Sequence, residues 1–323
     1  MNLGLAADIG STNARFGLAR PGPNRTPVLS DVAVFPCRDF PNIDAAIAAY
    51  LSQLPADAKP TAGTLAIAGP IAGDNVKLTN NPWHFSIAGL RKQIGFAHLS
   101  IINDFAAISL SLMALPTEGM VSIGPQADLR QAQRLGVIGP GSGLGVGGLI
   151  RYDGLDMPIP SEGGHVNFSA QTEREWAIAR RLQAKFGHVS NERLLSGPGL
   201  VNLYESLAEI DGRTAAPLRD ADIVHRAIDN TDPTCREALE HFCDILGSAA
   251  GDLALLLYAD AVFIAGGIVP RFVDVLKVSE FRKRFEAKGR YAAHLAEVPT
   301  LVITEKYAGL IGAAVHLLQR KAD

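Results

Sequence analysis

The sequence has little cysteine, and what it has is scattered along the chain. Cys37, Cys235 and Cys243 show neither the close spacing of zinc ligands nor the pattern of a disulfide framework. So few thiols are typical of a protein that works in a reducing compartment. We therefore expect a cytoplasmic protein that is not held together by disulfide bonds.

Apolar runs long enough to cross a membrane are also missing. The longest candidate, at residues 253–257, lies between Asp252 and Asp260, whereas a spanning helix needs about 20 apolar residues. The N-terminus has no basic segment, and Asp8 interrupts its apolar run, which argues against a signal peptide. We expect no membrane partner.

The sequence lacks an excess of basic residues as well. The formal net charge is −3, and residues of both signs are interspersed. A protein that wraps nucleic acid usually carries a basic excess, so no nucleic-acid partner is expected.

What the sequence does contain is enough apolar residues for full cores. Of its 323 residues, 47% are hydrophobic and 20% charged, which suits two domains better than one. Short apolar runs alternate with amphipathic stretches, and this alternation predicts an α/β fold. Strands are expected at 3–9, 14–19, 65–68, 99–102, 135–138, 146–152, 261–264 and 301–304. Helices are expected at 43–54, 86–94 and 104–113, near Pro233 and Pro270, and from about Ala308.

Local signals predict several helix ends. Thr172 and Glu175 have the spacing of a capping box, which predicts a helix that begins there and ends at Gly187. Ser86 is expected to cap its helix, and Asp232 precedes a proline that suits a first helical turn.

Two segments of the chain resemble each other. Residues 10–20 (GSTNARFGLAR) align without gaps on residues 141–151 (GSGLGVGGLIR), and each is a glycine turn that leads into a strand. Duplication is one explanation, and a chance match between short glycine-rich pieces is the alternative. Duplication would give two related half-domains, each offering a phosphate-binding turn to a shared cleft.

The first glycine turn follows a carboxylate at a strand end. In Asp8-Ile9-Gly10-Ser11-Thr12-Asn13, backbone N–H groups and hydroxyls can hold phosphate oxygens, while the carboxylate holds a hydrated Mg²⁺. An ordinary hairpin gives the same pattern.

The second glycine-rich segment, residues 139–145, is denser. Its glycines and Gly148 match the G-x-G-x-x-G dinucleotide fingerprint, but that fingerprint requires a helix next, and a strand is predicted at 146–152. The sequence contains no Gly-Lys dipeptide, so a Walker lysine is excluded. A third turn, at Gly266 and Gly267, can let an adenosine lie against the backbone or can simply connect a strand to a helix.

Polar residues of a different kind follow two other segments. Asp104 comes directly after an apolar strand, where it can cap a helix or act as a general base. Glu162 and His165 flank a glycine pair that makes a helix, and hence a helical di-iron site, improbable. These two side chains and Glu192 suit hydrogen bonding to several hydroxyls, although each alone is equally consistent with a solvated surface residue.

Taken together, the motifs resemble the bacterial glucokinase family of the non-ROK type. They occur in the family's order over nearly the whole chain: DIGSTNAR at 8–15, TNNPW at 79–83, IINDF at 101–105, GPGSGLGV at 139–146, SEGGHVNF at 161–168, ERLLSGPGLVNLY at 192–204 and FIAGGIVPRF at 263–272. The zinc-binding cysteine cluster of ROK sugar kinases is absent. The family's first motif usually reads Gly-Gly-Thr, and here Ser11 replaces the second glycine, which would be strained at positive φ.

The resemblance implies an α/β actin-like ATPase (ribonuclease H-like) fold with two domains that flank a cleft. It implies a small domain of residues 1–114 plus 306–323 and a large domain of residues 115–305. The implied activity is transfer of the γ-phosphoryl of ATP to the 6-hydroxyl of D-glucose, the first step of glycolysis, by a Mg²⁺-dependent homodimer.

The resemblance also assigns roles to individual residues. Asp104 is the implied catalytic base, and the implied glucose ligands are Asn103, Asp104, Glu162, His165 and Glu192. Asp8 is implied to hold Mg²⁺ through water. The implied nucleotide-binding residues are Asp8, Gly10, Ser11, Thr12, Asn13, Gly139, Gly141, Ser142, Gly143, Gly145, Gly266 and Gly267.

Three other functions stay open at this point. The first is a kinase for mannose, fructose or an N-acetyl hexosamine, and ADP or polyphosphate can replace ATP on related scaffolds. The second is a sugar-responsive regulator without catalysis, although Asp8 leaves little room for a preceding DNA-binding segment. The third is a chaperone-like or actin-like ATPase, which would not explain Glu162, His165 and Glu192.

Overall fold

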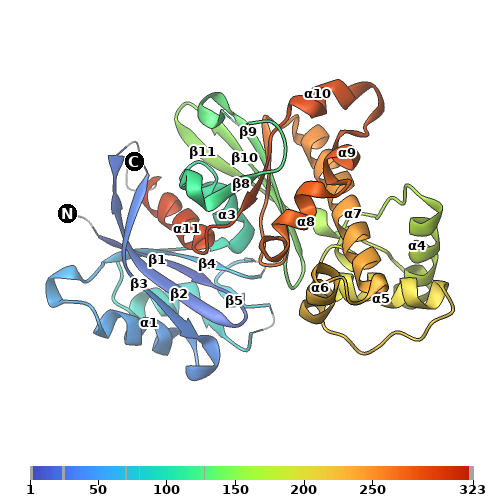
Figure 1. Cartoon of the computed structure of the whole chain (residues 1–323). Coiled ribbons are helices and arrows are strands. Elements are labelled where there is room, and N and C mark those ends of the chain that lie inside the picture. Colours follow the sequence, from blue (N-terminus) through green and yellow to red (C-terminus); the bar gives the residue numbers. More distant parts are fainter. Residues whose placement is uncertain (1–2, 24–25, 70, 80, 127, 320–323) are drawn as a thin grey trace. The chain divides into compact units, whose positions relative to one another are not determined.

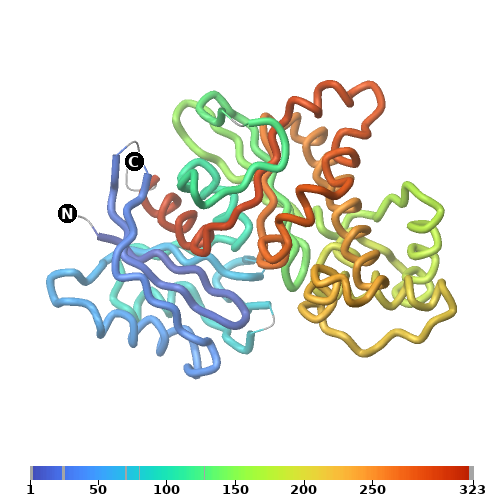
Figure 2. Tube along the Cα trace, in the orientation of Figure 1, coloured from blue at the N-terminus to red at the C-terminus, as the bar shows by residue number. Residues whose placement is uncertain are grey.

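The computed structural model describes residues 3–23, 26–69, 71–79, 81–126 and 128–319. The chain divides into two compact units, one of residues 1–117, 151–159 and 305–323 and the other of residues 118–150 and 160–304. Figures 1 and 2 follow the chain from the N-terminus in blue to the C-terminus in red. The domain boundaries implied by the resemblance stay a prediction. Among the described residues, no helix has both the length and the apolar character needed to span a bilayer.

The first unit is built on a mixed sheet with the strand order β3-β2-β1-β4-β7. Strands β1, β2 and β3 pair antiparallel, whereas β1, β4 and β7 run parallel. The strands are β1 (Gly4–Ile9), β2 (Asn13–Pro21), β3 (Pro27–Pro36), β4 (Ala62–Ile67) and β7 (His98–Asn103), with a separate hairpin of β5 (Asn75–Lys77) and β6 (His84–Ser86).

The two faces of this sheet carry side chains of different size. In β1, Leu5, Ala7 and Ile9 join the larger side chains of α1 (Ile43–Ser52) in one core. Ala6 points to the other face, because side chains alternate along a strand, and there it packs with α3 (Asp104–Ser111) and α11 (Ala308–Gln319). Asp8 has the same parity as Ala6 and therefore faces α11.

Small residues let α11 approach the first unit closely. A Cβ on Gly312 would collide with the backbone oxygen of Ala107 in α3, and one on Gly309 would lie 2.8 Å from Cγ of Asp8. The core on this side consists mostly of alanines, with Leu310 and Leu317 supplied by α11. The unit also contains α2 (Ile87–Gln93), which Ser86 caps through Gly89 N–H as the sequence predicts.

The second sheet has the strand order β11-β10-β9-β12-β13-β8. Its members are β8 (Met120–Ser122), β9 (Arg134–Pro140), β10 (Leu144–Tyr152), β11 (Leu155–Ser161), β12 (Ala261–Ile264) and β13 (Thr300–Ile303). Strand β9 pairs antiparallel with β10 and parallel with β12, and β12 pairs parallel with β13. In the first sheet, β1 likewise pairs antiparallel with β2 and parallel with β4. Both sheets therefore contain a glycine hairpin whose first strand is extended by parallel strands. The repetition favours duplication over a chance match between residues 10–20 and 141–151.

Helices of the second unit enclose a large apolar core against this sheet. The long α7 (Pro233–Leu257) is capped by Asp232, as predicted. Its Leu253 side chain packs closely on the backbone of Gly136 in β9. The other helices are α4 (Glu173–Phe186), α5 (Gly197–Ile210), α6 (Asp220–Ile228), α8 (Val273–Val278), α9 (Phe281–Glu286) and α10 (Ala292–Glu297). The expected α/β actin-like ATPase fold is thus what the two sheets and their helices form.

Some local predictions need correction. Thr172 caps α4 through Glu175 N–H, but the buried Glu175 carboxylate does not return the bond to Thr172. It accepts the N–H of the preceding residue, Gln171, at 2.6 Å and pairs with Arg284 at 2.7 Å. The segment at Pro270 is a 3-10 turn, and α8 begins only at Val273. Ser11 has no positive φ, so the strain considered for it does not arise.

Candidate functional site

The parallel strands of the first unit end at one edge of its sheet. Ile9 of β1 is in register with Ile67 of β4, which is in register with Asn103 of β7. Because carboxyl ends of parallel strands form the usual binding edge of an α/β sheet, the Asp8 turn and Asn103-Asp104 come to the same edge. The structure therefore brings together two motifs that are about a hundred residues apart in the sequence.

Asp8 is held by a partner on the neighbouring strand. Its carboxylate accepts a hydrogen bond from Arg15 Nη1 at 2.9 Å, and the two residues face each other in the β1–β2 register. Burial raises the pKa of Asp8, while the Arg15 charge acts in the opposite direction. Arg15 thus stabilises an anionic carboxylate at a site that disfavours charge.

The turn after Asp8 is fixed by backbone and side-chain bonds. Gly10 N–H donates to Asn13 O at 2.9 Å, and Cys37 N–H donates to Thr12 O at 2.8 Å. The buried Asn81 side chain donates to the backbone oxygens of Gly10 and Ser11 at 3.4 Å each, and Cys37 Sγ lies 3.6 Å from Gly10 O. The turn is consequently pre-formed, with the hydroxyl-bearing residues Ser11 and Thr12 exposed.

Asn103 is the N-cap of α3, and Asp104 is not. Asn103 Oδ1 accepts hydrogen bonds from Phe105 N–H at 2.8 Å and Ala106 N–H at 3.3 Å. Asp104 is the first helical residue, and its Oδ1 accepts a second bond from the same Phe105 N–H at 2.9 Å. The interpretation of Asp104 as a plain helix cap is therefore weakened, since another side chain already satisfies that helix end.

The environment of Asp104 favours its neutral form. Burial is the main cause that raises the pKa of Asp104 to about 6, and the negative charge of Asp8 raises it further. Hydrogen bonds from the backbone and from Asn103 act against this rise. A carboxylate with a pKa near the working pH is suited to take up and release a proton.

In the second unit, a glycine turn again lies at the edge where parallel strands end. Ile138 of β9 and Val302 of β13 are both in register with Ile264 of β12. The turn that joins β9 to β10 is closed by Gly141 N–H, which donates to Gly143 O at 2.8 Å. The strand β10 follows this turn, where a dinucleotide fingerprint would need a helix, so the structure confirms that the fingerprint does not apply.

The glycines of these turns divide into two kinds. The fold needs Gly266, which has φ +84° and whose Cβ would collide with Pro140 O. Among the described residues, no atom lies within 4 Å of a Cβ built on Gly267, and none lies closer than 3.6 Å to one built on Gly10 or Gly141. None of these three has positive φ, so packing within the chain does not explain why they are glycines.

The remaining predicted sugar-binding residues gather in the second unit. The segment that contains Glu162 and His165 pairs with the segment that contains Glu192, through a bridge between Asn167 and Ser190. His165 Nδ1 lies 4.0 Å from Glu192 Oε1. Glu192 is not a solvated surface residue, because its Oε2 accepts a hydrogen bond from Leu144 N–H at 2.9 Å.

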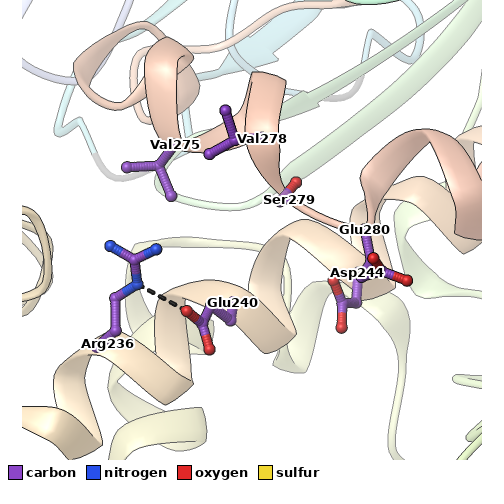
Figure 3. A pocket seen from close by; sticks show the side chains of 7 residues that line it. All are labelled: Arg236, Glu240, Asp244, Val275, Val278, Ser279 and Glu280. Atoms are coloured by element: carbon purple, nitrogen blue, oxygen red, sulfur yellow. Dashed lines mark hydrogen bonds and ion pairs between the residues drawn. The ribbon is translucent and has the colours of Figure 1, made fainter.

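A pocket of about 200 Å³ lies elsewhere in the second unit and contains none of these residues. Figure 3 shows Arg236, Glu240 and Asp244 of α7 on one side of it and Val275, Val278, Ser279 and Glu280 on the other. Arg236 pairs with Glu240 at 2.7 Å, and burial raises the pKa of Asp244 to about 6. The residues that line the pocket include no glycine turn, and Arg236 stands there among three carboxylates, so the lining suits a triphosphate poorly.

The predicted Mg²⁺ site fits a nucleotide-borne ion and not a protein-enclosed one. Among the described residues, no group of three or more His, Cys, Asp or Glu side chains is arranged to hold a metal ion. Mg²⁺ in kinases is usually held by one or two carboxylates, waters and substrate phosphates. Asp8 has the hard oxygen donors that such a site needs. Asp104 lies near enough for the negative charge of Asp8 to raise its pKa.

Several supporting residues were missed from the sequence. Arg15 lies in the first motif and could have been found from the hairpin register. If residues 9 and 14 pair on either side of the turn, Asp8 must lie opposite Arg15. Asn81 and Cys37 carried no local signal, because their contacts with Gly10 span 71 and 27 residues. The Leu144 backbone N–H is equally invisible in a sequence.

The two sheets and their helices form the fold of the actin-like ATPase class, and the comparisons with known proteins make this chain a sugar kinase of that class. The glucokinase family model matches residues 5–320, and the chain belongs to the glucokinase family. A glucokinase of Nitrobacter hamburgensis is 44% identical over 313 residues, which cover 97% of this chain and 96% of the relative. A solved glucokinase from an Antarctic psychrotroph has a TM-score of 0.90 at 38% identity, with 99% of each chain covered. The glucose complex of a Balamuthia mandrillaris glucokinase has the same fold, with a TM-score of 0.76 at 19% identity over 98% of this chain and 93% of that one.

Proposed function

We propose that this member of the glucokinase family transfers the γ-phosphoryl of ATP to the 6-hydroxyl of D-glucose, with Asp104 as the general base. The observation that carries the assignment of Asp104 is its setting: a carboxylate with a pKa of about 6, at the strand edge that also bears the Asp8 turn, beside a helix already capped by Asn103. In this proposal Asp104 takes the proton of the attacking hydroxyl, which typically contributes about 10²–10⁴-fold to the rate.

The sugar is bound by side chains that discriminate among hydroxyls. Asn103, Asp104, Glu162, His165 and Glu192 are proposed to act on one glucose. A site with several polar side chains penalises a hexose that leaves one of them unpaired, because an unpaired buried polar group loses its hydrogen-bonding energy. The 4.0 Å separation of His165 from Glu192 supports a joint role for these two residues.

The nucleotide is held mainly by backbone groups. The glycine turns, with Gly10, Ser11, Thr12 and Asn13 in one unit and Gly139, Gly141, Ser142, Gly143 and Gly145 in the other, are proposed to bind its phosphates. Gly266 and Gly267 are proposed to lie against the adenosine. Mg²⁺ bound to the nucleotide neutralises charge on its phosphates, and Asp8 is proposed to hold that ion through water. The space at Gly267, Gly10 and Gly141 supports these roles.

The decisive experiment is a direct search for the product. Purified protein with Mg-ATP and D-glucose should form glucose 6-phosphate and ADP in equal amounts. The same assay with mannose, fructose and N-acetylglucosamine should give much slower turnover, and ADP and polyphosphate should replace ATP poorly. Turnover of ATP that does not depend on glucose would contradict the proposal and favour a chaperone-like or actin-like ATPase. Binding of glucose without phosphoryl transfer would favour a regulator.

We also infer a cytoplasmic homodimer. All three cysteines are free and buried in the structure, which suits a reducing compartment. Light scattering on the purified protein tests the dimer, and a mass of one chain would contradict it.

A further inference from the structure

We propose that Glu192 couples sugar binding to the shape of the phosphate-binding turn in the second unit. This inference rests on the proposed function, because it takes Glu192 as a sugar ligand and residues 139–145 as a phosphate-binding turn. What it adds is a direct bond between the two: the carboxylate that faces the sugar site also accepts the backbone N–H of Leu144, at the end of the turn.

The two oxygens of Glu192 face different partners. Oε2 accepts from Leu144 N–H at 2.9 Å, and Oε1 lies 4.0 Å from His165 Nδ1. An ionised carboxylate has room for about four hydrogen bonds, so a sugar hydroxyl can donate to Glu192 while the bond to Leu144 persists. Each of the two bonds restricts the carboxylate, and each therefore favours the other.

Gly143 makes this arrangement possible. A Cβ at Gly143 would lie 2.5 Å from Glu192 Oε2, which is closer than real side chains allow. The φ of Gly143 is not positive, so the backbone itself does not require glycine there. The Glu192 carboxylate thus occupies the space that a side chain at residue 143 would fill, and it would have to move if one were present.

The turn is held from two further directions by the segments that carry the sugar ligands. A Cβ on Gly164, between Glu162 and His165, would collide with Leu144 O, so this backbone packs directly on Leu144. On the other side, Gly197 N–H donates to Gly141 O at 2.9 Å, and Ser196 Oγ donates to Glu192 O at 2.8 Å. The glycine turn is thus packed and hydrogen-bonded against the sugar-binding segments.

Coupling follows from this shared construction. When a sugar fixes Glu192, the Leu144 end of the turn is fixed as well, and the nucleotide then meets a turn whose ordering has already taken place. Binding couplings are reciprocal, so the nucleotide tightens sugar binding by the same factor. Glu192 is accordingly a positioning residue for the phosphate turn in addition to its proposed contact with sugar.

The experiment compares nucleotide affinity with and without glucose. Calorimetry with the non-hydrolysable analogue Mg-AMPPNP gives its Kd for the free protein and for protein saturated with glucose. For the unchanged protein we expect binding to tighten at least about fivefold, a typical coupling between sites. For Glu192→Ala, measured at a glucose concentration that saturates the variant, the ratio should fall to about one. Glu162→Gln is the matched control, since it weakens glucose binding but leaves the bond to Leu144, and its ratio should remain.

A second pair of variants leaves every carboxylate-bearing residue unmutated. Gly143→Ala should displace Glu192 from Leu144 and lower the ratio, whereas Gly141→Ala, whose nearest contact is 3.9 Å away, should keep it. Thermal unfolding checks that both variants are folded. A ratio near one in the unchanged protein, or an undiminished ratio in folded Glu192→Ala and Gly143→Ala, overturns the inference. Failure of the unchanged protein to form glucose 6-phosphate would instead overturn the proposed function.

Discussion

Asn103 caps helix α3 with its side-chain oxygen and leaves Asp104, its neighbour, as the first residue of the helix. The two side chains therefore have separate structural positions although they are adjacent in the chain. One completes the backbone hydrogen bonding of a helix end, and the other keeps a carboxylate with a pKa of about 6 at the edge of the sheet.

Replacing Asp104 by Asn should abolish turnover without abolishing sugar binding. An amide of the same shape cannot accept the proton of the attacking hydroxyl, so kcat should fall at least about 10²-fold. Steady-state kinetics gives kcat, and glucose titration followed by intrinsic fluorescence gives the Kd, which should change much less. A near-normal kcat would remove Asp104 from the role of base.

The pH dependence of kcat should follow the ionisation of Asp104. The base acts only when it is deprotonated, and its pKa in the folded protein is about 6. We expect kcat to be nearly constant above pH 7 and to fall about tenfold for each pH unit well below 6. A kcat that stays constant from pH 7 to pH 4.5 in a folded protein would contradict the assignment.

The raised pKa of Asp104 also predicts that its ionised carboxylate lowers the stability of the folded protein, although the same ionised form is the one proposed to act in catalysis. The pKa of Asp104 is raised on folding, so ionisation favours the unfolded chain, and the cost is largest above pH 6 and vanishes below about pH 4. Asp104→Asn should therefore raise the free energy of unfolding at pH 7.5 by roughly 1–2 kcal/mol, allowing for partial exposure. Urea unfolding at pH 7.5 and pH 4 measures this, and the gain should disappear at the lower pH.

Two adjacent glycines should respond differently to alanine. Gly266→Ala introduces a Cβ that collides with Pro140 O at a positive φ, so it should destabilise the protein by about 1–3 kcal/mol. Gly267→Ala meets nothing within 4 Å and should leave stability unchanged. If the adenosine lies against this turn, Gly267→Ala should raise the KM for ATP and leave the KM for glucose unchanged. Equal loss of stability in both variants would contradict this division.

Asn81 should matter to the nucleotide and not to the sugar. Asn81→Ala removes two donors to the Gly10–Ser11 backbone, so the turn loosens and the KM for Mg-ATP should rise about fivefold, as for a lost hydrogen bond. The KM for glucose should be unaffected. Cys37→Ser, which keeps a donor beside Gly10 O, is the matched control with little change. A fall in stability with both KM values unchanged would show a purely structural role for Asn81.

Much of the fold could be predicted because its elements carry local signals. The buried strands β1, β9 and β12 are short apolar runs, and α7 has both a cap and a proline at its start. The edge strand β7 was predicted at 99–102, but the edge strand β3 was missed, since it is only partly buried and its order depends on pairing with β2. The capping box at Thr172 was half wrong, because the Glu175 carboxylate bonds to Gln171 N–H and to Arg284, 109 residues away, and not to the cap itself.

The sequence predicts which residues belong to the candidate site but not how they are arranged in space. The resemblance supplied Asp104 and Glu192 with their proposed roles, yet their surroundings come from contacts distant in the sequence. Glu192 meets Leu144 across 48 residues, and the partner atom is a backbone nitrogen that any residue type would offer. Such contacts leave no pattern in a single sequence, except in the glycines that make space for them.

The last helix of the chain has a consequence for how the protein is made. Leu310, Ala313, Ala314 and Leu317 of α11 fill the core against Ala6 of β1, a strand that is synthesised long before α11. When residues 1–117 have been synthesised, this face of the sheet is covered by α3 but still lacks the side chains of α11. The face stays only partly covered until α11 emerges after the second unit, so we expect the nascent first unit to depend on chaperones up to that point.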